Sequence, residues 1–138
     1  MPSKTTLRKA REDKRQGKSP STQAGEFVRE EVEHIREGKH GARSPQQAIA
    51  IGLSKARRAG VDLPPPKKGK TSPATRRKAK QDLAKARSGA KHKISAKRSR
   101  ARTQSLKREG RSAASHRALS RHAKSAAARR RRTGTVSA

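Results

Sequence analysis

The sequence predicts an all-α fold in which a small helical hairpin head, residues 1–66, precedes a long, largely disordered or nascent-helical basic tail, residues 67–138. The first segment holds 14 basic and 8 acidic side chains, whereas the second holds 25 basic and 2 acidic ones. Apolar residues make up 28% of the chain, well below the ~45–50% of globular proteins. Such a composition is typical of disorder, so no compact core is expected to run the length of the chain.

Serine, proline and glycine mark the ends of three helix-compatible stretches. A serine hydroxyl suits the N-cap, proline suits the first helical position, and glycine suits the left-handed residue after a helix. The Ser-Pro steps are Ser19-Pro20, Ser44-Pro45 and Ser72-Pro73, and the glycines are Gly38, Gly60 and Gly89.

The head is expected to contain three helices, over about residues 5–16, 20–37 and 45–59. The first is short, and its Arg8–Glu12 pair lies at i,i+4 spacing. The second has apolar residues at every third or fourth position, which predicts one buried stripe. The third opens with a capping box formed by a serine and the glutamine three residues later.

The second and third helices are predicted to form an antiparallel αα-hairpin. Three consecutive prolines at 64–66 then end the head. The large apolar side chains of this hairpin are few, so we expect the head to be marginally stable alone or to form a homodimer through the two helices. The predicted core consists of Phe27, Val28, Val32, Ile35, Ile49, Ile51 and Leu53.

In the tail, residues 73–88, 96–109 and 112–132 have alanine-rich, helix-compatible patterns. Ala79, Leu83 and Ala86 form a thin apolar stripe on the first of them. Alanine favours helix, but like charges at i,i+4 oppose it. We therefore expect local helix propensity here rather than a packed fold, with more helix once phosphates neutralise the charge.

A tail of this charge density predicts binding to nucleic acid, because phosphates attract lysine and arginine whatever the base sequence. We expect a non-enzymatic protein of the bacterial nucleoid that contacts the DNA backbone without strong sequence preference. The predicted contacts are Lys55, Arg57, Arg58, Lys67, Lys68, Lys70, Arg76, Arg77, Lys78, Lys80, Arg98, Arg100, Arg102, Arg129, Arg130, Arg131 and Arg132.

Two other functions remain open. Ribosomal proteins also carry basic extensions, so the chain could associate with RNA or the ribosome, although DNA is the favoured partner. Alternatively, the hairpin could bind a partner protein while the tail anchors it to nucleic acid. No aromatic side chain follows Phe27, which disfavours single-strand binding by base stacking.

Two features of the head have competing interpretations. Gln46 and Gln47 could reach base edges in a helix-turn-helix, or Gln47 could simply complete the capping box, which we favour. The acidic face of the second helix could be solvated, could dock on Arg57 and Arg58, or could mask the basic tail; its members are Glu26, Glu30, Glu33 and Glu37.

Several classes are excluded on composition and pattern. The chain has no cysteine, no run long enough to span a membrane, and no nucleophile–base constellation or glycine-rich phosphate loop. We therefore expect no catalysis, no cofactor and no small-molecule substrate. We also expect a cytoplasmic location. The histidines show no metal-ligand spacing, so no metal is expected; they are His34, His40, His92, His116 and His122.

The head also resembles a known family. The similarity lies in STQAGEFVREE (residues 21–31) and HIREGKHGARSPQQAIAIGLSKARRAGVDLPPP (residues 34–66). It is to a bacterial family of small basic proteins of unknown function, some of which are labelled DNA-binding or plasmid-stabilisation proteins. This resemblance implies a bacterial cytosolic origin and a helical head, and no catalytic residue. The tail is similar to linker-histone tails in composition only.

Overall fold

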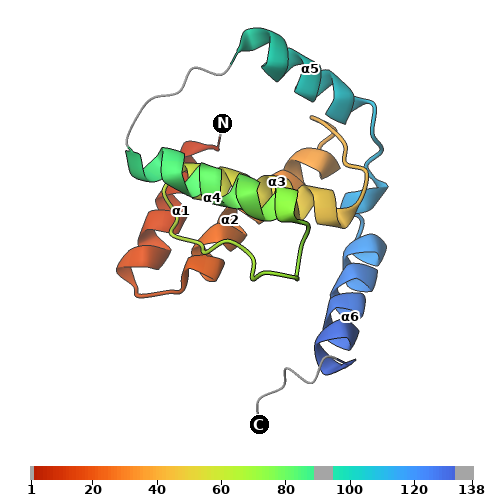
Figure 1. Ribbon diagram of the computed structural model, residues 1–138. Helices are drawn as coiled ribbons and strands as arrows, with labels where there is room; N and C mark the ends of the chain where they lie inside the picture. Colours follow the sequence, from red (N-terminus) through yellow and green to blue (C-terminus); the bar gives the residue numbers. More distant parts are fainter. Residues whose placement is uncertain (1, 89–94, 133–138) are drawn as a thin grey trace.

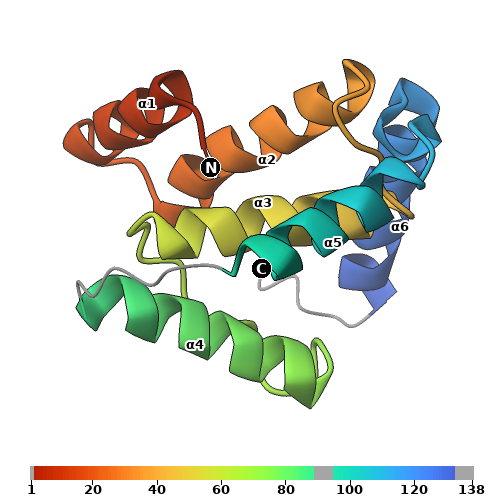
Figure 2. The ribbon, with the colours of Figure 1, turned by 90° about the horizontal axis from the view of Figure 1, so that it is seen from above.

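The computed structural model describes residues 2–88 and 95–132, which form six α-helices and one short 3-10 helix (Figure 1). The elements are α1 (Lys4–Arg15), α2 (Pro20–Arg36), α3 (Pro45–Arg58), α4 (Pro73–Ser88), α5 (Ala96–Lys107), η1 (Ser112–Ala114) and α6 (His116–Arg132). Helices α1 to α4 lie together and are called the body. Helices α5 and α6 are called the arms, because they lie at the edge of the body (Figures 1 and 2).

The three helices predicted for the head are present as α1, α2 and α3, but the expectation of a small hairpin head followed by a long, largely disordered tail is wrong. Three of the six described α-helices lie after residue 66. Two of them gain support from packing, because α4 contacts α3, and η1 and α6 contact α3. The sequence interpretation weighed alanine propensity only against charge repulsion. It omitted the tertiary contacts that small apolar patches make with the head.

Helix boundaries follow the serine, proline and glycine pattern closely. The N-caps Ser19, Ser44 and Ser72 accept hydrogen bonds from the backbone N–H groups of Thr22, Gln47 and Thr75 at 3.3, 3.2 and 3.2 Å. Gly38 follows α2 with φ 80° and Gly60 follows α3 with φ 103°, the left-handed region that glycine adopts without strain. The third predicted stop, Gly89, lies outside the described residues.

One hydrophobic cluster holds α1, α2 and α3 together. Phe27 of α2 is 1% exposed and packs with Ala10, Ala24, Ala56 and Val61, all of them buried. The small residues let the helices approach closely, since a Cβ on Gly52 of α3 would lie 2.7 Å from the Val28 Cα. The partly buried leucines around this cluster are Leu7, Leu53 and Leu63.

A second cluster joins α2 and α3 to the C-terminal half of the chain. Ile35 packs with Ala42, Ala48, Ala113 and Ala114, and all five side chains are buried. The two C-terminal alanines belong to η1, some 80 positions beyond α2 in the sequence. The sequence analysis assigned no role to them, because two alanines beside many cations give no periodic signal.

The loop after α2 receives the segment that precedes η1. The backbone N–H of Gly41 donates to the Leu106 carbonyl at 2.8 Å, and the N–H of Ala42 donates to the Gly110 carbonyl at 3.0 Å. A Cβ on Gly41 would overlap the backbone of Glu109. Only glycine therefore allows this close approach of two chain segments.

Helix α4 covers the other side of α3. Its predicted stripe is correct in part, because Ala79 and Leu83 are buried, and Asp82 is 1% exposed. The Asp82 carboxylate accepts hydrogen bonds from the Ser54 hydroxyl of α3 at 2.6 Å and from the Lys78 ammonium at 2.7 Å. One acidic residue in a basic segment thus anchors α4 to the head.

The two arms bury very little. Neither α5 nor α6 has a fully buried residue. Among the described elements, α5 packs against no other helix, whereas α6 contacts η1 and α3. Helix α5 therefore exposes nearly all of its side chains, whereas α6 has several partly buried residues, among them Leu119 and His122.

The predicted hairpin core is partly correct. Phe27 and Ile35 are buried, whereas the other predicted members are only partly buried. Helices α1 and α4 and the short η1 supply the apolar partners that the sequence analysis assigned to a second chain. Homodimer formation stays a prediction, but its original argument, an uncovered apolar face, no longer applies.

Candidate nucleic-acid interface

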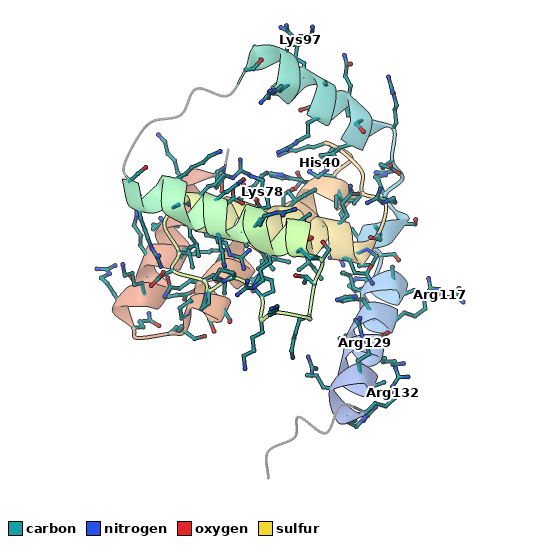
Figure 3. The ribbon with its side chains drawn as sticks, in the orientation of Figure 1. His40, Lys78, Lys97, Arg117, Arg129 and Arg132 are labelled. Carbon is teal, nitrogen blue, oxygen red and sulfur yellow. The ribbon has the colours of Figure 1, made fainter. Side chains whose placement is uncertain are left out.

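The arms carry basic residues and no acidic ones. Helix α5 contains five lysines and arginines, and α6 contains seven; neither contains aspartate or glutamate. All twelve of these cationic residues are exposed. In Figure 3 the side chains of Lys97, Arg117 and Arg132 point away from the body. The arms therefore present positive charge that no acid on the same helix offsets.

Most of the predicted contact residues lie on the surface, although they belong to several different elements. Those in the arms are Arg98, Arg100 and Arg102 on α5 and Arg129, Arg130, Arg131 and Arg132 on α6. Those exposed on the body and its connecting segment are Arg58, Lys67, Lys68, Lys70, Arg77, Lys78 and Lys80. The structure thus brings the predicted cations onto the outside of a folded chain rather than along an extended tail.

Three predicted contact residues have structural partners and are at most partly exposed. Arg57 is buried, and its guanidinium donates to the carbonyls of Leu63 and Pro64 at 3.2 and 3.0 Å. Its burial lowers its pKa, while nearby Asp82 acts in the opposite direction. Lys55 is ion-paired with a buried glutamate, and Arg76 donates to a proline carbonyl. These three residues are therefore left out of the candidate interface.

The sequence analysis missed five cations of the arms, which share the exposure of the predicted ones. They are Lys97 and Lys107 on α5 and Arg117, Arg121 and Lys124 on α6. The signal that could have found them is the absence of acid over the whole of each helix, rather than the local clustering of arginines.

Three acidic residues of α2 and its C-cap, Glu30, Glu31 and Glu37, have partners within the body. Glu30 accepts the Ser3 backbone N–H at 2.9 Å, and Glu37 pairs with Lys39 at 3.3 Å. Burial would raise the pKa of Glu30, but the Ser3 N–H and the Thr6 hydroxyl lower it overall. The ion-pair partners of these carboxylates are His34, Lys39, His40 and Lys55, all of which lie before position 66. These ion pairs therefore give no support to the hypothesis that the acidic face of α2 masks the basic tail.

Gln47 acts in the helix cap. Its backbone N–H donates to Ser44 Oγ, and its side-chain Oε1 accepts the Arg43 backbone N–H at 2.6 Å. The reciprocal bond reaches the residue before the N-cap rather than the N-cap itself. With its side-chain oxygen engaged, Gln47 is poorly placed to read bases, whereas Gln46 is exposed.

A cluster of possible metal ligands lies where α2 ends. Glu31, His34 and His40 each bring one ligand atom within 4.8 Å of the others. The first two lie one turn apart on α2, and His40 comes from the loop that follows. Sequence spacing did not reveal the cluster, because the loop turns back on the helix. Another histidine, His92, lies outside the described residues.

Within the described residues, no helix is long and apolar enough to cross a membrane. In a comparison with known protein families, a family of unknown function (DUF6496) matches residues 11–68, which run from the end of α1 through α2 and α3 to the segment after them. No curated protein and no solved structure matches the chain. The similarity is confined to the part of the body that the arms join, and it assigns no activity.

Proposed function

We propose that this chain is a binding protein that holds nucleic acid by its phosphate backbone, without strong sequence preference and without catalysis. The observation that supports this most is the pair of arms, which carry twelve exposed lysines and arginines and no acid. A phosphate polymer is the abundant cellular partner for such a surface, and its bound counterions are released when lysine and arginine replace them.

Geometry supports contact with several phosphates at once. At 1.5 Å per residue, α5 is about 18 Å long and α6 about 25 Å long. The exposed cations of α4 add a third basic helix, in which only Asp82 is acidic and that residue is buried. Folded helices hold these charges in fixed positions, so less chain entropy is lost on binding than for a disordered tail.

The chemistry of these helices favours backbone contact over base readout. Their exposed cations suit phosphate oxygens, and phosphate contacts carry no direct sequence information. Phe27, the one Phe, Tyr or Trp of the chain, is buried in the body and cannot stack on a base. The protein is therefore expected to bind duplexes of different sequence with similar affinity.

The test is a charge-neutralised variant of α5 measured against duplex DNA over a salt series. Because α5 has no fully buried residue, replacing Lys97, Arg98, Arg100 and Arg102 by Gln leaves the packing of the body unchanged. If these residues contact about four phosphates, the slope of log affinity against log salt becomes shallower by about 3–4.

A matched control separates local contact from net charge. Replacing Lys4, Arg8, Arg11 and Lys14 of α1 by Gln lowers the net charge of +29 by the same four units. These residues are exposed, but α1 also carries Glu12 and Asp13. The proposal requires a larger change of slope for the α5 variant than for the α1 variant. If the two variants change the salt slope equally, the arms act only through the net charge of the protein and not through local contacts.

Duplex DNA is the proposed partner over RNA, with a place in the bacterial nucleoid. Competition between duplex DNA and ribosomal RNA at the same salt concentration distinguishes the two. If ribosomal RNA displaces DNA preferentially, the same basic surface would instead serve an RNA-binding or ribosome-associated function.

A further inference from the structure

We propose that Glu31, His34 and His40 form a binding site for a divalent transition-metal ion, with Zn²⁺ as the best-fitting occupant. The three side chains come from one turn of α2 and the loop behind it. Glu31 is 1% exposed, and the side chains of His34 and His40 are 21% and 13% exposed. Their ligand atoms lie within 4.8 Å of one another, so small side-chain rotations bring all three onto one ion.

The hydrogen bonds at His40 are compatible with a metal cation between it and Glu31. His40 Nδ1 lies 2.9 Å from the Gly41 carbonyl, which can only accept, so Nδ1 carries the proton. His40 Nε2 lies 3.1 Å from Glu31 Oε2. In a neutral ring that nitrogen has a lone pair, which faces a carboxylate oxygen. A metal cation between the two atoms satisfies both, as does a second proton on the ring, and titration with the metal distinguishes the two.

The surroundings of His40 match those of a histidine that binds a metal. A ligating histidine usually donates its other ring N–H to a backbone carbonyl or a carboxylate, which fixes the tautomer and the ring orientation. The Gly41 carbonyl fills that role here. The second oxygen of the carboxylate is also held, because Glu31 Oε1 pairs with the Lys55 ammonium of α3. Glu31 Oε2 is therefore the oxygen available for a metal.

The ligand set selects the class of metal. Two imidazoles and one carboxylate suit Zn²⁺ and similar ions, whereas Mg²⁺ and Ca²⁺ prefer oxygen ligands alone. Three protein ligands leave a fourth position for water. His40 lines an open cavity of about 650 Å³ and His34 lines another of about 230 Å³, so water and the ion can enter from either side.

Metal binding would stabilise the junction between the body and the C-terminal half. The loop that carries His40 also donates the Gly41 and Ala42 N–H groups to the carbonyls of Leu106 and Gly110. Holding His40 on α2 fixes this loop in the conformation that receives the later segment. The site itself does not depend on the proposed nucleic-acid function.

The experiment is calorimetric titration of metal-free full-length protein with ZnCl₂ at neutral pH, with Co²⁺ absorption as a check on tetrahedral coordination. We expect one ion per chain. Loss of an outer-shell partner of a metal ligand weakens metal binding by about 10–100-fold. His34→Gln and His40→Gln each remove a ligand, so each should weaken Zn²⁺ binding by more than this. His116→Gln, an exposed histidine of α6, is the control and should bind as the unchanged protein does.

A second readout does not depend on the variants folding well. Amide exchange of Gly41 and Ala42 in the unchanged protein should slow when Zn²⁺ is added, while that of α5 should not. Failure to bind Zn²⁺, affinity unaffected by His40→Gln, or equal weakening by His116→Gln would overturn the proposal. None of these results bears on DNA binding by the arms, so the two proposals fail separately.

Discussion

The body and the arms contain the same basic residue types but use them differently. In the body, six ion pairs of lysine or arginine connect described residues between positions 12 and 87, and buried or partly buried cations such as Arg57 and Lys55 bind carbonyls or carboxylates. In the arms, the cations stand on helices without acid and without a fully buried residue. The difference teaches that charge density alone does not mark a binding surface, because a buried cation with an internal partner, such as Arg57, is unavailable to a ligand.

The largest loss of stability is expected on substitution of Phe27, which is the largest fully buried side chain of the body. Phe27→Ala should lower the free energy of unfolding by about 3–5 kcal/mol, because it removes apolar contacts and leaves a cavity. Chemical denaturation measures this loss. Thr103→Ala on exposed α5 should stay within about 0.5 kcal/mol. A small effect at Phe27 would mean that the body is not held by this cluster.

The second-largest loss of stability is expected when the Asp82 carboxylate is removed. Asp82→Asn weakens the hydrogen bonds from Ser54 and Lys78, and the expected cost is on the order of 1.5–3 kcal/mol, as for hydrogen bonds to charged groups. Asp62→Asn is the control, because Asp62 is exposed and its pair with Arg87 lies on the surface. Equal stability of the two variants would contradict the role of Asp82 as the anchor of α4.

The Asp82 anchor also predicts a pH dependence. Burial would raise the pKa of this carboxyl, but hydrogen bonds from Lys78 and Ser54 and the nearby charges of Lys78 and Arg58 lower it below its ordinary value. Its contribution to stability is therefore present above the unfolded pKa of about 4 and is lost as pH falls through the lower folded value. Thermal unfolding across that range should show a smaller loss of stability in Asp82→Asn than in the unchanged protein, because the contribution of Glu30 remains in both.

Gly41 tests the junction between the body and the arms. Gly41→Ala forces a Cβ into the Glu109 backbone and should cost about 1–3 kcal/mol, the range for overpacking. It should also speed amide exchange at Ala42. Gly25→Ala on the open side of α2 has no atom within 4 Å of the new Cβ and should stabilise the helix by about 0.5–1 kcal/mol. If both variants behave alike, the junction is not tightly packed.

The smallest expected effect compares two helix caps. Ser44→Ala at the start of α3 should lower global stability by about 1 kcal/mol. Ser95→Ala at the start of α5 should change it far less, although its Oγ accepts the Arg98 N–H at 3.5 Å. The N-terminal end of α5 can open without disturbing the body, because α5 packs on no described helix and its hydrogen bond to Gly41 is made by Leu106 in its last turn. Equal losses would show that α5 folds together with the body.

The sequence predicted local structure better than packing. Serine caps and terminal glycines placed α2 and α3 within a residue or two, because these signals act over one turn of helix. Docking of Ala113 and Ala114 on Ile35 could not be foreseen, since it joins residues nearly 80 positions apart through small side chains. This docking also requires Gly41, because any Cβ at that position would overlap the backbone of Glu109.

The candidate sites show the same limit. Exposure of the arm cations follows from the absence of acid and of large apolar residues on α5 and α6, which is visible in the sequence. Burial of Arg57 depends on how the chain after α3 folds back, and so it was missed. The grouping of His40 with Glu31 depends on the path of the loop after α2, which residue spacing does not encode.

The most direct test of the central claim is the affinity of the full-length protein for duplex DNA as salt is raised. If the arms and α4 together replace the counterions of about eight phosphates, log affinity should fall against log salt with a slope of about −7. Affinity would then drop about 10⁴-fold between about 50 and 200 mM salt. An affinity that stays constant over this range, or is unchanged when the α5 cations are neutralised, would contradict the account.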